Sequence, residues 1–247
     1  MTDVELDTEL PRVLRQLWGQ DEPPRRGPKP GLTIGAIAAA AVKIADADGL
    51  GAVSMARVAG ELGFTTMSLY RYVESKDDLF VVMLDAAYGP PELGDLTGLD
   101  WRERLTVWAT AAHERLLQRP WILEVPVKEP PLAPNQMSWM EEGLQALSGT
   151  GLAEHEKLSS MLLVDVYVRG ITQLAAHMVR SDMTVEEADR IYGARLAAVI
   201  DPDELPGIAK AFGSGSLTDG SDFSVDEFQF GLATVLDGIA ALVERRN

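Results

Sequence analysis

Hydrophobic residues recur every three or four positions over long stretches of this chain, and runs that strictly alternate apolar and polar residues do not appear. Ala, Leu, Glu and Met dominate the periodic stretches, whereas the β-branched runs typical of strands are absent. The pattern predicts an all-α protein. It predicts four short helices between residues 33 and 89, a turn near 121–125, and longer helices at 100–118, 135–148, 154–181, 184–199 and 224–245.

Glycine, proline and capping residues divide these helices from one another. Residues 8–18 have helical spacing, and we expect a short helix there that docks on the body. Residues 21–31 contain four prolines and two glycines, which predicts an extended arm or linker. The Gly-, Pro-, Ser- and Asp-rich segment 200–223 predicts a loop with at most one short helix. Four residues stand where they can cap a helix: Thr33, Ser54, Thr65 and Ser75.

Charge is divided unevenly along the chain, whose formal net charge is −16. Residues 25–76 carry seven Lys and Arg against four Asp and Glu, whereas the remainder carries 15 basic and 34 acidic residues. The overall charge argues against a protein that coats nucleic acid with a uniformly basic surface, but it leaves room for a local basic site. The acidic remainder favours a cationic or neutral small-molecule ligand over an anionic one.

Several classes of function are excluded or disfavoured by what the sequence lacks. There is no cysteine, and no two of the three histidines have metal-ligand spacing on one helix, so we expect no metal site. Phosphate-binding loops, zinc-hydrolase motifs and nucleophile elbows are absent, so we assign no catalytic residue and no cofactor. No apolar run approaches the roughly 18 residues of a membrane span, and the N-terminus is acidic, so we expect a cytoplasmic protein without a membrane partner.

A helix-turn-helix is predicted from the helix that follows Ser54, the tight turn at Gly63, and a short helix at about 66–73. Leu69 and Val73 can face the supporting helices. The second helix of such a motif enters the major groove, where hydroxyl, methyl and guanidinium groups meet phosphates and base edges. The candidate DNA-binding residues are Thr66, Met67, Ser68, Tyr70, Arg71, Tyr72 and Lys76, with Thr33 at the start of the first helix. For Arg25, Arg26 and Lys29, a DNA-contacting arm and a solvated linker are equal alternatives.

Residues 33–80 resemble the DNA-binding domain of the tetracycline-repressor (TetR) family of transcriptional regulators, on the strength of "GFTTMSLYRYV" and the following "SK-DL". In that family this helix lies in the major groove and the lysine that starts helix 4 meets phosphate. The resemblance implies these roles for the candidates above and adds Thr65. The segments "RPW" at 119–121 and "APNQMSWMEEGLQAL" from 133 are more loosely similar to the family's C-terminal domains.

The resemblance also implies a homodimer, a palindromic operator in double-stranded DNA, and a small-molecule effector bound in the C-terminal domain. The family's tetracycline–magnesium sites use a histidine near the end of helix 4. Residues 75–95 contain none, which counts against tetracycline as the effector.

We therefore expect an N-terminal extension and basic arm (1–30), a helix-turn-helix domain (31–90) and a larger helical effector-binding and dimerisation domain (91–247). The fourth predicted helix, which begins at Ser75 and ends at Gly89, would join the last two domains, with Lys76 at its DNA end and Tyr88 at its body end. The candidate effector-pocket residues are Trp108, His113, Trp121, Met137, Trp139, Met140, Met161, Asp165, Tyr167, Arg169 and His177. Asp165 and Arg169 would form either an i,i+4 ion pair or a polar stripe along a cavity or interface.

The expected function is that of a repressor released from its operator by a small molecule, dimerising through helices 154–181 and 224–245. Gly231 and Gly238 lie near one face of the last helix, which indicates close helix approach. The apolar residues beside them are Phe228, Leu232, Val235, Leu236, Ile239 and Leu242. Two alternatives remain: a dimeric DNA-binding regulator without an effector, and an all-α enzyme with an incidental helix-turn-helix.

Overall fold

The computed structural model describes residues 9–20, 31–178, 185–214 and 223–246, with the side chains of 177–178, 185–189 and 223–226 left out of the description. These residues form helices, turns and irregular connections without a strand, which confirms the all-α prediction. The helices are α1 (Arg12–Leu17), α2 (Ile34–Asp48), α3 (Met55–Leu62), α4 (Thr66–Leu69), α5 (Lys76–Tyr88), α6 (Trp101–Gln118), α7 (Pro134–Ala146), α8 (Glu154–Met178), α9 (Val185–Val199), α10 (Pro206–Gly213) and α11 (Phe223–Glu244), with 3-10 turns η1 (Leu50–Ala52) and η2 (Pro120–Glu124).

Local hydrogen bonds start three of the N-terminal helices as the sequence predicts. The side-chain oxygens of Thr33, Ser54 and Ser75 each accept from the backbone N–H three residues later, at 3.1, 3.2 and 3.0 Å. The prediction for Thr65 is wrong in detail, because its hydroxyl lies 3.0 Å from the hydroxyl of Ser68 and caps no backbone group. Helix α4 is also shorter than expected, since its last turn opens into the turn at 70–72.

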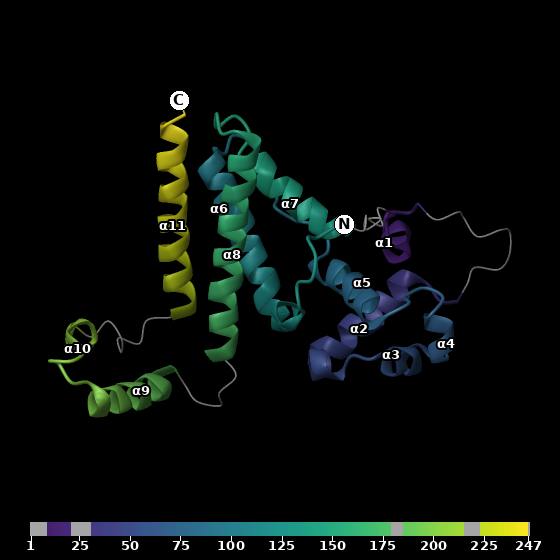
Figure 1. The fold of residues 1–247 in the computed structure, drawn as a ribbon, viewed down its shortest axis with the longest axis horizontal. Coiled ribbons are helices and arrows are strands. Elements are labelled where there is room, and N and C mark those ends of the chain that lie inside the picture. The colour runs from purple at the N-terminus through teal and green to yellow at the C-terminus, as the bar shows by residue number, and fades with distance from the viewer. Residues whose placement is uncertain (1–8, 21–30, 179–184, 215–222, 247) are drawn as a thin grey trace, which may run out of the picture.

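Helices α2 to α5 form a small unit in which α2 and α5 pack against each other and α3 and α4 lie across one side (Figure 1). The predicted docking of the N-terminal helix is confirmed: α1 buries Val13 and Leu14 and contacts α5. The indole Nε1 of Trp18, just past the end of α1, donates to the backbone oxygen of Leu132 at 2.8 Å. Helix α1 thus touches both α5 and the segment that leads into α7.

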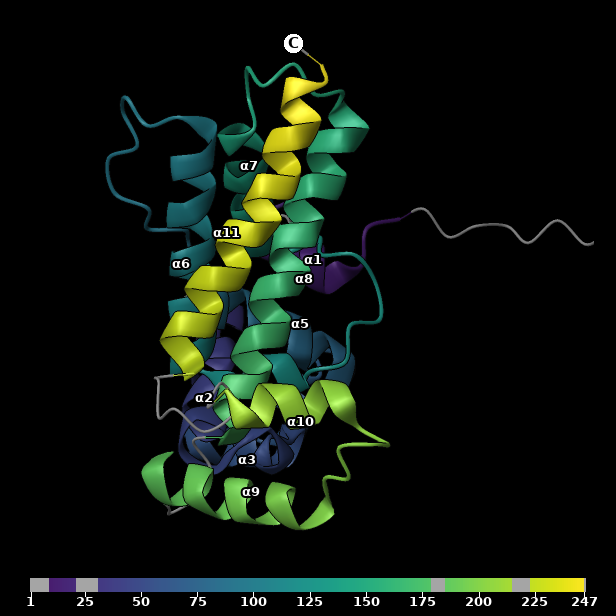
Figure 2. The same ribbon diagram turned by 90° about the vertical axis from the view of Figure 1, so that its left-hand side faces the viewer.

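The C-terminal part is a bundle of α6, α7, α8 and α11, in which the long helices α8 and α11 run antiparallel side by side (Figures 1 and 2). Helices α9 and α10 lie beyond the ends of α8 and α11, away from the bundle, in Figure 1. Helix α10 is a single short helix in the described part of segment 200–223, where the sequence predicts at most one. Within the described residues, none of the helices combines the length and apolar character that would let it cross a bilayer.

The apolar face of α11 packs inside the chain, whereas the sequence predicts that it lies at a subunit interface. The side chains assigned to a subunit interface are largely buried inside this one chain: Phe228, Leu232, Leu236 and Ile239 are each 2–3% exposed. A Cβ atom at Gly231 would lie 2.2 Å from the hydroxyl oxygen of Tyr167 on α8 of the same chain. The close approach that Gly231 indicated is therefore intramolecular, whereas no atom lies within 4 Å of a Cβ placed at Gly238.

Candidate nucleic-acid interface and the helices behind it

The turn between α3 and α4 is fixed by backbone geometry. Gly63 adopts φ 72° and ψ 25°, a left-handed conformation that favours glycine. Its N–H donates to the oxygen of Gly60 at 3.2 Å, and the N–H of Phe64 donates to the oxygen of Ala59 at 2.9 Å. These two bonds form a Schellman motif, which ends α3 abruptly and turns the chain directly into α4.

Helix α4 and the turn after it present two different faces. Leu69 and Val73 are completely buried, as predicted for the supporting side, whereas Met67 is 75% and Tyr70 is 43% exposed. Arg71 is exposed beside them. Tyr72 differs from expectation, because it is only partly exposed and packs against the core. Thr66 and Ser68 are likewise partly buried, and Thr65 is exposed.

Positive charge in this region is concentrated where α4 meets α5. Two of the cations in residues 31–90 are neutralised: Lys43 lies 2.5 Å from Glu61, and Arg57 pairs with Asp48. Arg71 and Lys76 form no ion pair with any described residue, and the Lys76 ammonium lies 5.2 Å from the Phe80 ring centroid. Within residues 31–90, the two cations available to an external anion are therefore Arg71, in the turn after α4, and Lys76, at the start of α5.

Two acidic side chains next to this surface are paired with cations from elsewhere in the fold. Arg12 of α1 lies 3.6 Å from Glu74, and Lys128 lies 2.7 Å from Asp77. Asp78 accepts from the backbone N–H of Glu74 at 2.7 Å. The surface can therefore approach a polyanion despite the chain's net negative charge. Thr33 is exposed at the start of α2, and the arm candidates Arg25, Arg26 and Lys29 lie outside the described residues.

Helix α5 leads from this surface into the C-terminal bundle, where its last turn is bonded to two other helices, α7 and α8. Asp85 accepts from the backbone N–H of Asn135 at 2.7 Å and from its side-chain amide at 3.1 Å. Arg169 of α8 donates to the Tyr88 hydroxyl at 2.7 Å, and Trp139 of α7 donates to the oxygen of Gly89 at 3.0 Å. Any motion of α7 or α8 is thereby coupled to α5.

A second connection joins the end of α2 to η2. Asp46 accepts from the indole Nε1 of Trp121 at 2.7 Å and from Arg119 Nε at 3.2 Å. Arg119 also donates to the oxygen of Ala87 at 3.3 Å. Trp121, expected as a pocket residue, is therefore part of the connection between the two parts of the chain. Asp46 also lines an open surface hollow of about 600 Å³ between α2 and α5.

The other pocket candidates divide into core residues and a polar group near Tyr88. Trp108 donates to the backbone oxygen of Trp139 at 2.8 Å, and its ring meets the Trp139 ring edge to face at 6.2 Å. His113 is buried, lies 2.7 Å from the Thr172 hydroxyl and stacks on Phe228 at 4.1 Å. The Tyr167 hydroxyl donates to backbone oxygens of α11. Met161 is buried, Met137 and Met140 are partly buried, and the side chain of His177 lies outside the described residues.

Asp165 and Arg169 do not form the i,i+4 ion pair that was one interpretation of their spacing. Both are partly buried, and Arg169 reaches Tyr88 instead. Burial raises the pKa of Asp165, against the opposing effect of the Arg169 charge. Burial also raises the pKa of Tyr88, which feels the charges of both Arg169 and Asp165. The three groups thus form one polar cluster at the end of α5.

Sequence reasoning missed Asp85, the most buried carboxylate of this region. It is 5% exposed, and burial raises its pKa despite its hydrogen bonds to the start of α7. The available signal was a charged residue within the apolar stretch that forms α5, since an acid in such a position is usually paired or functional. In the described residues, no group of three His, Asp or Glu side chains is arranged to hold a metal ion.

Comparison with known proteins agrees with this architecture. Residues 37–83 match the bacterial regulatory proteins of the tetR family, and residues 93–243 match the tetracyclin repressor-like C-terminal domain. The chain is 39% identical to the HTH-type transcriptional repressor DrrR1 of Streptomyces coeruleorubidus over 97% of this chain and 88% of that protein. It is 32% identical to an HTH-type transcriptional regulator of Saccharopolyspora erythraea over 62% of this chain and 65% of that protein.

Two crystal structures of ActR from Streptomyces coelicolor share the fold. The apo form has a TM-score of 0.74 at 23% identity, covering 89% of this chain and 100% of that one. The complex with actinorhodin has a TM-score of 0.72 at 24% identity, covering 85% and 96%. The matched families and the curated relatives are transcriptional regulators rather than enzymes. The chain therefore belongs to the TetR family of bacterial transcriptional regulators.

Proposed function

We propose that this chain is a homodimeric repressor that binds a palindromic operator through α4 and its surroundings, and that a small molecule bound among α6, α7 and α8 releases it. The observation that carries the proposal is the position of α5. Its first residue, Lys76, is an unpaired cation beside α4, and its last residue, Tyr88, is bonded to Arg169 of α8. A ligand that displaces Arg169 or Trp139 would tilt α5 and move the DNA-binding surface. Such coupling is typically worth about 1–3 kcal/mol, or about 5–150-fold in affinity.

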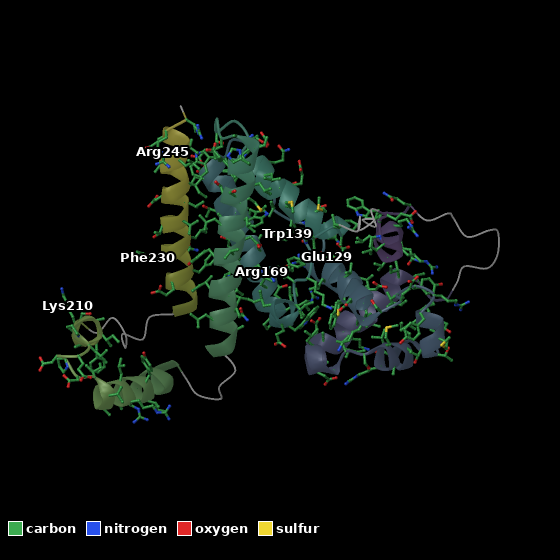
Figure 3. The ribbon with its side chains drawn as sticks, viewed as in Figure 1. Glu129, Trp139, Arg169, Lys210, Phe230 and Arg245 are labelled. Carbon is green, nitrogen blue, oxygen red and sulfur yellow. The ribbon has the colours of Figure 1, made fainter. Side chains whose placement is uncertain are left out.

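Exposed apolar side chains on α8 support dimerisation. Leu162, Leu163 and Val166 lie close together on α8 and are 54%, 52% and 59% exposed. Phe230 of α11, which Figure 3 labels, is 72% exposed. Monomeric proteins rarely leave such apolar areas uncovered, and a second copy would cover them. A dimer would set the two α4 helices about 34–36 Å apart, one turn of DNA. The variant Leu162→Asp should then sediment as a monomer and lose operator affinity.

The operator half of the proposal is tested by selecting duplexes from a random library with the full chain. The selected sites should be palindromic, with half-sites about one helical turn apart. Arg71→Ala should relax the base preference at one position in each half-site, because a bidentate guanidinium–guanine contact discriminates by about 1–3 kcal/mol. The matched control is Arg195→Ala on α9, which should select the same sites as the wild type.

The effector half is supported by the ActR complex with actinorhodin, which shows that a protein of this fold binds a small molecule. Compounds that raise the melting temperature of the wild type would be added to the protein–operator complex at fixed salt. At least one of them should lower operator affinity. If every tight binder leaves operator affinity unchanged, a dimeric regulator without an effector takes the place of this proposal.

A further inference from the structure

The short helix α1 touches both parts of the chain at once. Its residues Val13 and Leu14 are only 4% and 6% exposed, and the helix packs against α5 of the N-terminal unit. The indole Nε1 of Trp18, just past the end of α1, donates to the backbone oxygen of Leu132 at 2.8 Å, in the segment that leads into α7. Figure 1 shows α1 beside α5 and close to the start of α7. Helix α1 therefore lies across the junction between the two parts.

Two ion pairs complete this arrangement at the end of α5 that faces α4. Arg12, the first residue of α1, lies 3.6 Å from Glu74, just before α5. Lys128, in the segment that leads into α7, lies 2.7 Å from Asp77 in the first turn of α5. Helix α1, the start of α5 and the segment before α7 are thus each joined to the other two.

A helix as short as α1 is held in place by its contacts. An isolated helix of so few residues is unstable in water, because its hydrogen bonds do not offset the entropy lost in ordering the chain. The helix-turn-helix unit has a core of its own, in which Ile37, Val58 and Leu79 are completely buried. The bond from Trp18 to Leu132 lies outside that core. It restrains the unit relative to the C-terminal bundle.

We propose that residues 12–18 form a clip that holds the DNA-binding surface in position, with Trp18 as the positioning residue that ties the clip to the C-terminal bundle. The last turn of α5 is anchored to α7 and α8 through Asp85 and Tyr88. A helix that is anchored at one end can still pivot, and the clip supplies the second anchor beside its first turn. A surface already fixed in the orientation that DNA requires loses less conformational entropy on binding.

The clip therefore acts on operator affinity, and the inference rests on the proposed function for that reason. Loss of the clip would spread the DNA-binding unit over further orientations. Operator affinity would then fall in proportion to the fraction of chains that remain competent to bind. Because Trp18 carries no charge, its loss would remove no phosphate contact, and the salt dependence of binding should stay the same.

The first measurement is the operator affinity of the full chain over a range of salt concentrations, with a duplex that the wild type selects. Trp18→Phe keeps an aromatic ring and removes the donor, whereas Leu14→Ala weakens the docking of α1. Each variant should bind the operator at least about threefold more weakly, the size of one modest net hydrogen bond, with an unchanged slope of log K against log salt. Trp101→Phe, at the partly exposed first residue of α6, is the matched control and should bind like the wild type.

The second measurement follows the orientation of the DNA-binding unit itself. The chain contains no cysteine, so Ala56→Cys on α3 and Ser148→Cys after α7, both exposed, can carry a pair of spin labels. Labelled chains are mixed with a large excess of unlabelled chain, so that a dimer carries a single pair. Pulsed double electron–electron resonance should give a narrow distance distribution for the wild type and Trp101→Phe. The distribution should be broader for Trp18→Phe and Leu14→Ala.

Three results would overturn the inference while the wild type still binds its operator. The first is equal operator affinity for the wild type and Trp18→Phe, whether or not the distance distribution broadens. The second is a loss of affinity without a broader distribution, because orientation would then not be what Trp18 controls. The third is a shallower salt slope for Trp18→Phe, because the variant would then have lost phosphate contacts. If the wild type binds no operator, the proposed function itself fails.

Discussion

Replacing Asp85 with alanine should destabilise the protein, because Asp85 caps a helix that lies in another part of the sequence. Helix α7 starts after Ala133, whose side chain offers no acceptor to the first turn. The Asp85 carboxylate takes this place by accepting from the backbone N–H of Asn135. The Asn135 side chain bonds back to Asp85, with Nδ2 3.0 Å from the backbone oxygen and 3.1 Å from the carboxylate.

The size of the effect follows from the loss of the cap, which destabilises the protein, and from the removal of a buried charge, which offsets part of that loss. Loss of an N-cap costs about 0.5–2 kcal/mol. A donor left unpaired in a buried site costs about 1–3 kcal/mol, which places Asp85→Ala at the upper end of the cap range. Part of this loss of stability is offset, because burial disfavours the charged form of Asp85 and raises its pKa. We expect a net loss of about 2 kcal/mol, or about 4–8 °C in melting temperature for a chain of this length.

Thermal unfolding followed by circular dichroism measures this loss, with Asp203→Ala at an exposed site as the control. A change below about 0.5 kcal/mol, the range of ordinary surface substitutions, would refute the capping role of Asp85. The pH dependence gives a second check. Because the folded pKa of Asp85 is raised, its contribution to stability is fully present below the unfolded pKa of about 3.9 and is lost as the pH rises through the folded pKa. Relative to Asp85→Asn, the wild type should therefore lose stability as the pH rises from about 4.

Two further predictions concern the C-terminal bundle. Burial lowers the pKa of His113, so its contribution to stability is present above the unfolded pKa of about 6.5 and is lost as the pH falls through the folded value. Melting curves between pH 7.5 and about 5 should show this loss in the wild type and in the control His155→Gln, but not in His113→Gln. Gly231→Ala should destabilise by about 1–3 kcal/mol because its Cβ would meet Tyr167. Gly238→Ala should be neutral or stabilising by up to about 1 kcal/mol, so equal urea midpoints for the two variants would contradict this packing.

Features set by neighbours in the sequence were predictable. Thr33, Ser54 and Ser75 bond to the backbone three residues away, so their positions alone indicated where helices begin. Gly63 marked the turn before α4 for the same reason, since only a left-handed residue makes that turn readily. The prediction that Thr65 caps a helix was wrong because α4 is a single turn. The Thr65 hydroxyl bonds to the Ser68 hydroxyl instead.

Contacts between distant segments were not predictable from one sequence. Asp85 and Asn135 are 50 positions apart, and Asp46 and Trp121 are 75 apart, with no local pattern to connect them. Periodicity likewise showed that α11 has an apolar face but not what covers it. In the structure Phe228 and Leu232 are buried within the chain. Among the described side chains of α8 and α11, the exposed large apolar ones lie on α8 and at Phe230. A hydrophobic face predicts burial but does not name the partner.

The central claim is that the surface around α4 and the start of α5 binds DNA. The most direct measurement is the salt dependence of operator affinity for the wild type, Lys76→Ala and Lys210→Ala. The affinity is measured by the fluorescence anisotropy of a labelled operator duplex. The slope of log K against log salt is negative, and each lost phosphate contact should reduce its magnitude by about 0.9. For a dimer of Lys76→Ala, which loses two such contacts, the slope should therefore be shallower by about two. Lys210 is exposed on α10, and its variant should keep the wild-type slope. A Lys76→Ala slope equal to that of the wild type and of Lys210→Ala would contradict this assignment.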